Sequence, residues 1–148
     1  MKNNLIIYTD GGARGNPGPA AIGYVAFAVK KGGALQELTR KGETIGSATN
    51  NQAEYRALIA ALAYALTHKP DVVEVRLDSE LVGKQLRGEY RVKDIDLKPL
   101  YAQAKQLELR CKRITYTLIP RELNKDADRE VNRAFDAAVF SSQIMIPQ

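Results

Sequence analysis

Cysteine, histidine and tryptophan are almost missing from this chain. It has one cysteine, Cys111, one histidine, His68, and no tryptophan. A single cysteine cannot close a disulfide within the chain, and one histidine beside it cannot complete a zinc site built from thiolates and imidazoles. A chain without a disulfide fits a reducing compartment, and we expect a cytoplasmic protein.

Long apolar runs and internal repeats are also missing. No apolar run approaches the roughly 20 residues that a membrane helix needs, and the first residues lack a signal-peptide pattern. We therefore expect no membrane partner. Because 148 residues are about the length of one domain, we assign residues 1–148 to a single domain. Its last residues, 144–146, are expected either to pack on the body or to fray.

Acidic residues are outnumbered by basic ones. The chain has 17 acidic and 22 basic residues, a formal charge of +5 and a pI near 9.3. A basic balance favours a polyanionic partner such as a nucleic acid. It does not identify that partner, because many basic surfaces serve only solubility.

The order of apolar runs and amphipathic stretches predicts an α/β fold. Short apolar runs bounded by turn residues predict strands at 5–8, 21–29, 35–44, 72–77 and 114–119. Apolar residues at helical spacing predict helices at about 50–68, 79–85, 97–110 and from 124 or 125 onward. The KKGG sequence at 30–33 predicts a tight hairpin between the second and third strands.

Two aspartates come at the ends of predicted strands. Asp10 follows the apolar run 5–8 at the edge of a glycine-rich turn, and Asp78 follows the strand at 72–77. A carboxylate there loses hydration, which is costly unless a cation, a metal or a donor compensates. Each aspartate also forms a common turn or capping pair with the residue after it, and each by itself is better explained that way.

Two further acids lie near the starts of predicted helices, on their inward faces. Thr49 and Gln52 match a capping box that begins the first long helix. Glu54 then falls one turn before the apolar stripe of that helix and on the same face. Asp128 aligns with the apolar stripe of the last helix, whereas Asp126 does not and is expected to face solvent. An acid near a helix start also benefits from the helix dipole, but it does so equally well facing solvent.

Taken together, the four acids predict one site. Inward carboxylates repel one another unless cations lie between them. Oxygen ligands without a histidine or cysteine cluster favour Mg²⁺ or Mn²⁺ over zinc. Two such ions can stabilise both the attacking and the leaving oxygen of a phosphoryl displacement. An acidic metal site in a basic chain therefore indicates a nuclease acting on nucleic acid.

Four motifs, in order along nearly the whole chain, resemble those of type 1 ribonuclease H. They are YTDGG with GNPGP at 8–19, TNNQAE at 49–54, LDS at 77–79 and NKDAD at 124–128. The resemblance implies a ribonuclease H-like fold, with a five-stranded mixed sheet of order 3-2-1-4-5 and helices on both faces. It also implies an endonuclease that hydrolyses the RNA strand of RNA–DNA hybrids with two Mg²⁺ ions. Its products carry 5′-phosphate and 3′-hydroxyl ends. The oxygen ligands themselves would suit Mn²⁺ as well, and the sequence does not rank the two ions.

The resemblance also assigns roles to residues. The catalytic, metal-binding acids correspond to Asp10, Glu54, Asp78 and Asp128. The surface that reads RNA 2′-hydroxyls corresponds to Gly11, Gly12, Asn16 and Asn50. Thr49 matches a residue that holds a phosphate of the DNA strand, although Ser47 and Asp94 replace the arginine and asparagine usually found with it. The expected partner is an RNA–DNA hybrid, and the expected state is a monomer.

Two features of many family members are missing. The basic, tryptophan-rich protrusion is replaced by GEYRVK at 88–93, as in the shorter archaeal branch. Hybrid affinity is then expected to rest on Lys84, Arg87, Arg91 and Lys93. The loop histidine before the last acid is also missing, and His68 is expected to be structural or exposed. Arg121, Glu122 or solvent would take over its task.

Two other functions stay open at this point. A non-catalytic hybrid-binding module of the same fold would gain nothing from four clustered carboxylates. A related nuclease acting on DNA or on double-stranded RNA would keep the acids. Asn16 and the TNN sequence at 49–51 disfavour DNA as the substrate, because they match the surface that reads RNA.

Overall fold

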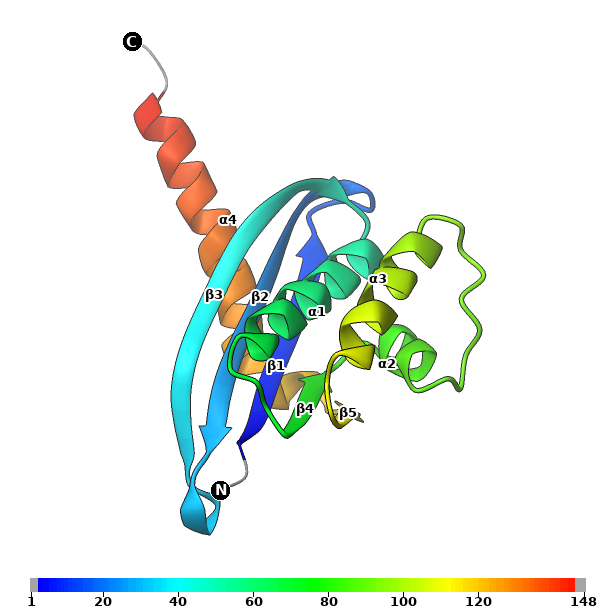
Figure 1. Cartoon of the computed structure of the whole chain (residues 1–148). Helices are drawn as coiled ribbons and strands as arrows, with labels where there is room; N and C mark the ends of the chain where they lie inside the picture. The colour runs from blue at the N-terminus through cyan, green and yellow to red at the C-terminus, as the bar shows by residue number, and fades with distance from the viewer. Residues whose placement is uncertain (1–2, 146–148) are drawn as a thin grey trace.

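The computed structural model describes residues 3–145, which form one five-stranded mixed sheet with helices on both of its faces (Figure 1). The strands are β1 (Asn4–Ala13), β2 (Gly18–Val29), β3 (Leu35–Ala48), β4 (Val72–Leu77) and β5 (Ile114–Leu118). The first three pair antiparallel, and β4 and β5 continue the sheet in parallel. The order β3-β2-β1-β4-β5 confirms the expected topology. Our expectation for the chain end falls partly on Ile146, outside the described residues.

The helices divide between the two faces. The helices are α1 (Asn50–Leu66), α2 (Glu80–Leu86), α3 (Lys98–Leu109) and α4 (Lys125–Met145), with short 3₁₀ turns η1 (Lys31–Gly33) and η2 (Arg121–Leu123). Figure 1 shows α1, α2 and α3 on one side, whereas α4 crosses the other face against β2 and β3. Within residues 3–145, no helix combines the length and apolarity needed to cross a membrane.

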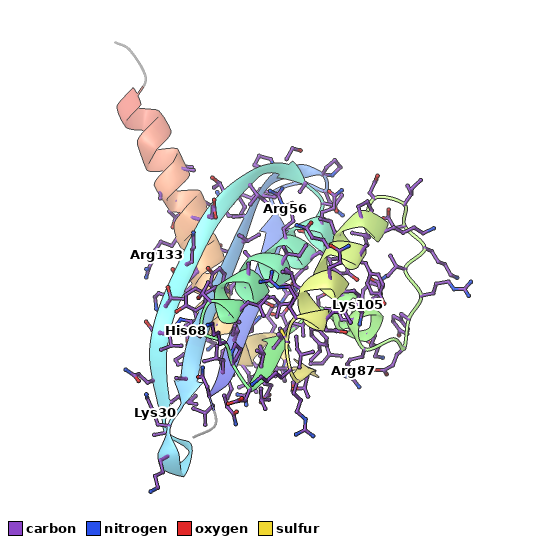
Figure 2. The ribbon with its side chains drawn as sticks, viewed as in Figure 1. Lys30, Arg56, His68, Arg87, Lys105 and Arg133 are labelled. Carbon is purple, nitrogen blue, oxygen red and sulfur yellow. The ribbon has the colours of Figure 1, made fainter. Side chains whose placement is uncertain are left out.

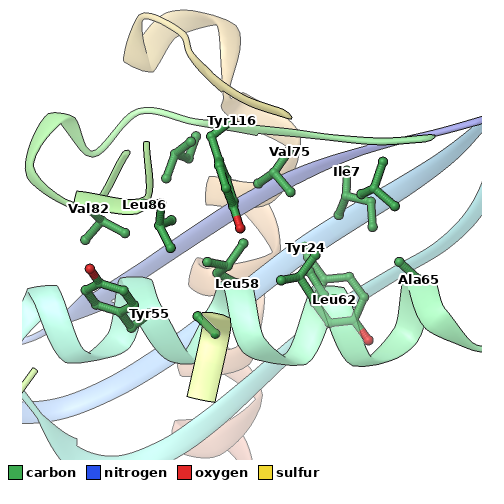
Figure 3. Close-up of a cluster of buried hydrophobic side chains, with 14 of the residues drawn as sticks. Ile7, Tyr24, Tyr55, Leu58, Leu62, Ala65, Val75, Val82, Leu86 and Tyr116 are labelled. Atoms are coloured by element: carbon green, nitrogen blue, oxygen red, sulfur yellow. The ribbon is translucent and has the colours of Figure 1, made fainter. Parts of the chain in front are cut away.

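The main hydrophobic core lies between α1 and the sheet (Figure 3). The predicted stripe of α1 is fully buried at Leu58, Ala61, Leu62 and Ala65. Facing it are apolar side chains of the central strands, among them Leu5, Ile7, Val73 and Val75. Each large apolar side chain buried in this way contributes roughly 1.5–3 kcal/mol. This packing fixes α1 on the sheet, and with it the position of its first turns.

Glycines let both α1 and α4 approach the sheet closely. A Cβ atom on Gly11 would overlap the backbone of Ala53 in α1. On the other face, a Cβ on Gly23 would lie 2.5 Å from the carbonyl oxygen of Ala127. A Cβ on its cross-strand partner Gly42 would overlap the carbonyl oxygen of Glu130, also in α4. Both helices that carry predicted site acids therefore pack directly against the backbone of glycines in the sheet.

Strand β1 extends beyond the apolar run that predicted it. The prediction ended the strand at Tyr8 and placed Asp10 at a turn, but pairing with β2 continues to Ala13, which lies opposite Ala20. Asp10 therefore lies inside the strand, and that part of the prediction was wrong. Gly11 serves the close approach of α1 rather than a turn.

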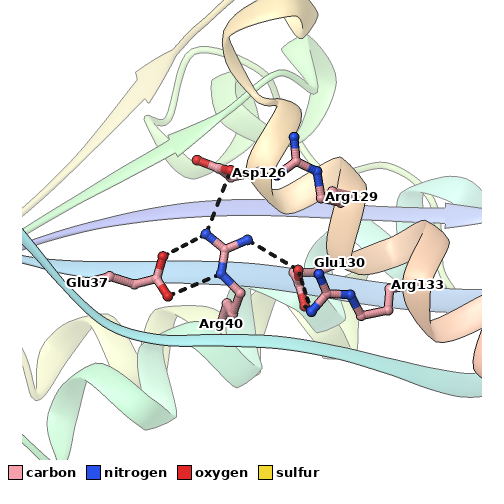
Figure 4. Close-up of polar contacts among 6 residues, drawn as sticks. All are labelled: Glu37, Arg40, Asp126, Arg129, Glu130 and Arg133. Atoms are coloured by element: carbon pink, nitrogen blue, oxygen red, sulfur yellow. Dashed lines mark hydrogen bonds and ion pairs between the residues drawn. The ribbon is translucent and has the colours of Figure 1, made fainter.

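An ion-pair network fastens the start of α4 to β3 (Figure 4). The Arg40 guanidinium bonds Glu37 through Nη2 at 2.6 Å and Nε at 3.1 Å, and its Nη1 lies 3.4 Å from Oε2 of the buried Glu130. Nη2 also lies 3.8 Å from Oδ1 of Asp126. Asp126, which we expected to face solvent, is therefore partly covered by this network.

Candidate active site

The four predicted acids line one cavity of about 630 Å³ at the carboxyl ends of β1 and β4. These strands are parallel neighbours, and Asp10 and Asp78 each come two residues after a paired position. Glu54 enters from the second turn of α1, and Asp128 from the first turn of α4. Four elements that are distant in sequence thus meet at one edge of the sheet.

Three of these carboxylates form a tight cluster. One ligand oxygen from each of Asp10, Glu54 and Asp78 lies within 4.8 Å of the others. Glu54 is only 8% exposed, and its Oε2 atom has no hydrogen-bond partner among the described residues. A buried carboxylate oxygen without a donor is costly, and a cation at this point would satisfy it. A set of carboxylates alone suits a hard ion such as Mg²⁺ or Mn²⁺, so the residues fit the expected metal.

Crowding changes the proton affinity of the cluster. Burial, followed by the charges of Asp10 and Asp78, raises the pKa of Glu54 well above its usual range, although the Gly11 amide opposes this. Burial and then the charge of Asp78 raise the pKa of Asp10 to about 7, with a smaller contribution from Asp128. Without a cation, the cluster therefore retains protons near neutral pH. Binding a divalent ion would release them.

Asp128 differs from the other three acids. We expected it on a buried helix face, but it is exposed to solvent. Its helical register nevertheless directs it to the cavity, which Val131 and Phe135 line as well. It lies near enough to Asp10 to affect the pKa of that residue, and Asn132 Nδ2 donates to its Oδ2 at 3.3 Å. Asp128 thus belongs to the solvated rim of the cluster.

Asn124 has a place in the site that sequence reasoning missed. It is fully buried, and its Nδ2 donates to the carbonyl oxygen of Thr9 and to Oδ2 of Asp78, both at 2.9 Å. In the sequence it is a polar residue just before a helix, which indicates an ordinary helix start. Nothing local reveals a partner 115 residues away.

Two asparagines beside the cavity hold their amides in fixed orientations. Asn50 Oδ1 accepts a hydrogen bond from the Ala13 amide at 2.7 Å, and Asn16 Oδ1 accepts one from the Asn50 amide at 3.0 Å. Because both oxygens are engaged, each side chain can offer its Nδ2 group as a donor to a ligand. Asn50, Gly11 and Gly12 line the cavity, whereas Asn16 is exposed and is not among the lining residues.

Thr49 confirms the predicted capping box at the start of α1. Its Oγ1 accepts from the Gln52 amide at 3.1 Å, and Gln52 Oε1 accepts from the Thr49 amide at 2.8 Å. The box fixes the first turn of α1 beside the cavity. The Thr49 hydroxyl can still donate its own proton to a ligand.

The other expected residues are divided between the cavity and the surface. Arg121 lines the cavity, whereas Glu122 is not among its lining residues. Lys84 and Arg87 each form a 2.7 Å ion pair with a nearby glutamate, which reduces the charge they can offer to a nucleic acid. His68 is exposed at the far end of α1 (Figure 2), 2.9 Å from the Tyr64 hydroxyl.

Known proteins are similar to this chain in both sequence and fold. The family described as Reverse transcriptase-like matches residues 8–134. The crystal structure of RNase H1 from the halophilic archaeon Halobacterium salinarum NRC-1 is 44% identical in sequence and superposes with a TM-score of 0.82. That match covers 90% of this chain and 98% of the other. The chain belongs to the type 1 ribonuclease H family.

Two further proteins with ribonuclease H domains are similar to this chain. LC11-RNase H1, isolated from compost by a metagenomic approach, has been solved in complex with an RNA/DNA hybrid. That structure is 44% identical, with a TM-score of 0.81, and covers 91% of this chain and 99% of its own. The bifunctional protein Rv2228c of Mycobacterium tuberculosis is 44% identical over 93% of this chain, which spans only 37% of that protein.

Proposed function

We propose that this chain is an endoribonuclease that hydrolyses the RNA strand of RNA–DNA hybrids and leaves 5′-phosphate and 3′-hydroxyl ends. The observation that carries the proposal is the cluster of Asp10, Glu54 and Asp78, whose ligand oxygens lie within 4.8 Å of one another. The buried Oε2 atom of Glu54 has no hydrogen-bond partner within residues 3–145, and a cation bound there would stabilise it. One chain supplies all four acids, and we propose that a monomer is active.

The carboxylates would hold two Mg²⁺ ions, or Mn²⁺ in their place. Asp10, Glu54 and Asp78 would form the buried part of the site, and Asp128 would bind from its exposed rim. When bound, the ions would neutralise charge on the attacked phosphate and lower the barrier to attack by water. Arg121, at the wall of the same cavity, would attract the phosphate.

Hybrid recognition would come from donors beside this cluster. Nδ2 of Asn50 and Nδ2 of Asn16 would donate to 2′-hydroxyls, the group that distinguishes RNA from DNA. The backbone of Gly11 and Gly12 would lie along the same groove, and the Thr49 hydroxyl would donate to a phosphate of the DNA strand. The complex of LC11-RNase H1 with an RNA/DNA hybrid supports this substrate class.

The test is a cleavage assay with three end-labelled substrates. An RNA–DNA hybrid, a double-stranded RNA and a double-stranded DNA of the same sequence are each incubated with the chain in Mg²⁺, Mn²⁺ or EDTA. We expect cleavage of the RNA strand in the hybrid only, in either metal and not in EDTA. An Asp10→Asn protein is the matched control for a contaminating nuclease, since it should be inactive.

Each alternative has its own outcome in this assay. Tight hybrid binding without cleavage in either metal would show that the chain is a binding module and not an enzyme. Equal cleavage of double-stranded RNA would make the chain a ribonuclease that is not specific for hybrids. Equal cleavage of double-stranded DNA would make it a general nuclease and would contradict the role of Asn16 and Asn50. A 3′-phosphate on the RNA products would contradict the proposed chemistry.

A further inference from the structure

We propose that Asn124 is a positioning residue, which holds Asp78 against the end of β1 and so sets the geometry of the carboxylate cluster for its cation. This inference rests on the proposed function, because it concerns the same metal site. Asn124 itself faces no part of the cavity: it is fully buried and is not among the lining residues. It would act through Asp78.

The hydrogen bonds of Asn124 join two neighbouring strands at the height of the cluster. Its Nδ2 lies 2.9 Å from the Thr9 carbonyl oxygen and 2.9 Å from Asp78 Oδ2. Both partners are acceptors, so the amide nitrogen and not the oxygen must face them. Thr9 directly precedes Asp10, so a single amide group sets the distance between Asp10 and Asp78.

The backbone of the same residue anchors the fourth acid. The Asn124 carbonyl oxygen accepts the amide of Asp128 at 3.1 Å, which is a first hydrogen bond of α4. A displacement of Asn124 would therefore change the position of Asp78 and the start of the helix that carries Asp128. Three of the four carboxylates are tied to this residue, and only Glu54 is placed independently.

The other end of the amide suggests that stability alone does not explain Asn124. Its Oδ1 is buried and accepts no hydrogen bond from any residue between 3 and 145. A buried acceptor without a hydrogen bond destabilises the folded state, and residues that lower stability in this way are expected at functional sites. The bond to Oδ2 leaves Asp78 Oδ1 as the oxygen for a cation, which is how supporting residues orient metal ligands.

Mn²⁺ binding without substrate tests the inference directly. In a calorimetric titration of the metal-free full chain, Asn124→Ala should weaken Mn²⁺ affinity by roughly 10- to 100-fold, the usual loss for a residue supporting a ligand. Gln85→Ala is the matched control. Gln85 is also a buried amide, 3% exposed, but it bonds the Tyr55 hydroxyl at 2.7 Å away from the cavity. Its loss should leave Mn²⁺ affinity unchanged.

Kinetics and magnetic resonance separate positioning from general damage. In Asn124→Ala, kcat should fall at low Mg²⁺ and recover as Mg²⁺ is raised, with KM for the hybrid unchanged. In the unsubstituted chain, the side-chain NH₂ signals of Asn124 should shift on Mg²⁺ addition with the affinity of the site, while those of Gln85 stay in place. This second measurement needs no variant, so it holds even where Asn124→Ala does not fold.

The outcomes distinguish this inference from the proposed function. Equal Mn²⁺ affinity in folded Asn124→Ala, or Asn124 signals that do not respond to Mg²⁺, would overturn the positioning role alone. Absence of Mn²⁺ binding by the unsubstituted chain would overturn the proposed function and this inference together. If Gln85→Ala lost Mn²⁺ affinity to the same extent, the loss in Asn124→Ala would be explained by lower stability. That result would also overturn the positioning role.

Discussion

Helices α1 and α4 each bring one acid to the cavity, from opposite faces of the sheet and in different ways. Helix α1 begins with a capping box and packs on the main core. Its Glu54 is 8% exposed, and one carboxylate oxygen accepts no hydrogen bond from the described part of the chain. Helix α4 is held by close glycine contacts and by the Arg40 network, and its Asp128 is exposed.

This difference divides the site into two parts. The fixed part is the cluster of Asp10, Glu54 and Asp78, and the solvated part is Asp128. A buried carboxylate is costly, and a fold that keeps one in place has a geometry that suits a cation before the cation arrives. A solvated carboxylate is stable without a cation, and the surrounding water weakens its attraction to any ion that it binds. We therefore expect the buried cluster to dominate catalysis, and Asp128 to contribute less.

The largest effect should come from the buried acid of α1. Glu54→Gln keeps the shape of the side chain and removes a ligand charge, which is worth several kcal/mol in such a site. Cleavage of the hybrid should fall about 10³-fold or more. Steady-state rates at saturating Mg²⁺ measure this, with circular dichroism to show an intact fold.

The matched control for Glu54→Gln is Glu80→Gln. Glu80 also lies at the cavity but is exposed and paired with Lys84 at 2.7 Å. Its amide variant should keep activity within about threefold, because a solvated ion pair contributes little. Wild-type turnover in Glu54→Gln would show that the buried cluster is not the reaction site.

The second prediction concerns the electrostatic repulsion among the carboxylates of Asp10, Glu54 and Asp78 when no metal is bound. The pKa of Asp10 is raised from 3.8 to about 7, so without metal the folded state binds a proton that the unfolded state releases. Stability from this proton is complete below about pH 4 and is lost as the pH rises through about 7, on the order of 4 kcal/mol. The raised pKa of Glu54 acts in the same direction.

Asp10→Asn isolates this contribution. In EDTA at pH 8 the variant should be more stable to urea than the unsubstituted protein, and the difference should shrink toward pH 4. Asp128→Asn should show a much smaller difference, because the acid is solvated. If the difference in unfolding free energy between Asp10→Asn and the unsubstituted protein did not change with pH, the raised pKa of Asp10 would be contradicted.

The features that could be predicted from the sequence are those set by neighbouring residues. The capping box of Thr49 and Gln52 and the buried stripe of α1 depend only on helical spacing, and both are confirmed. The strand order required the family resemblance, since no local pattern specifies which strands pair.

What could not be predicted depends on contacts between distant segments. Strand β1 continues past Asp10 because β2 pairs with it, which no apolar run reveals. Asn124 looks like a helix start until its bond to Asp78, 46 residues away, is seen. Periodicity correctly directed Asp128 to the cavity side of α4, but it could not show that solvent reaches that side.

The third prediction compares two acids on α4 that carry the same charge. Asp128→Asn should lower kcat/KM about tenfold, because a solvated ligand contributes about 1–2 kcal/mol. Asp126→Asn should change it less than about twofold, since Asp126 lies 3.8 Å from Arg40 on the side of the helix facing β3. Both are assayed at saturating Mg²⁺. The reverse order would mean that the register of α4 differs from the one described.

The smallest effect is expected at the opposite end of α1, where the chain's single histidine lies. His68 is 14 residues beyond Glu54, or roughly 20 Å at 1.5 Å per residue, and its ring packs beside Tyr64 with Nε2 2.9 Å from the Tyr64 hydroxyl. A histidine that moved protons during the reaction would leave its titration in the rate profile. His68→Ala should therefore keep kcat within about twofold and leave the pH–rate profile superimposable on that of the unsubstituted protein. Both are measured across pH at saturating Mg²⁺. A large loss in folded His68→Ala would mean that the two ends of α1 are coupled, and that the fixed part of the site extends well beyond its carboxylates.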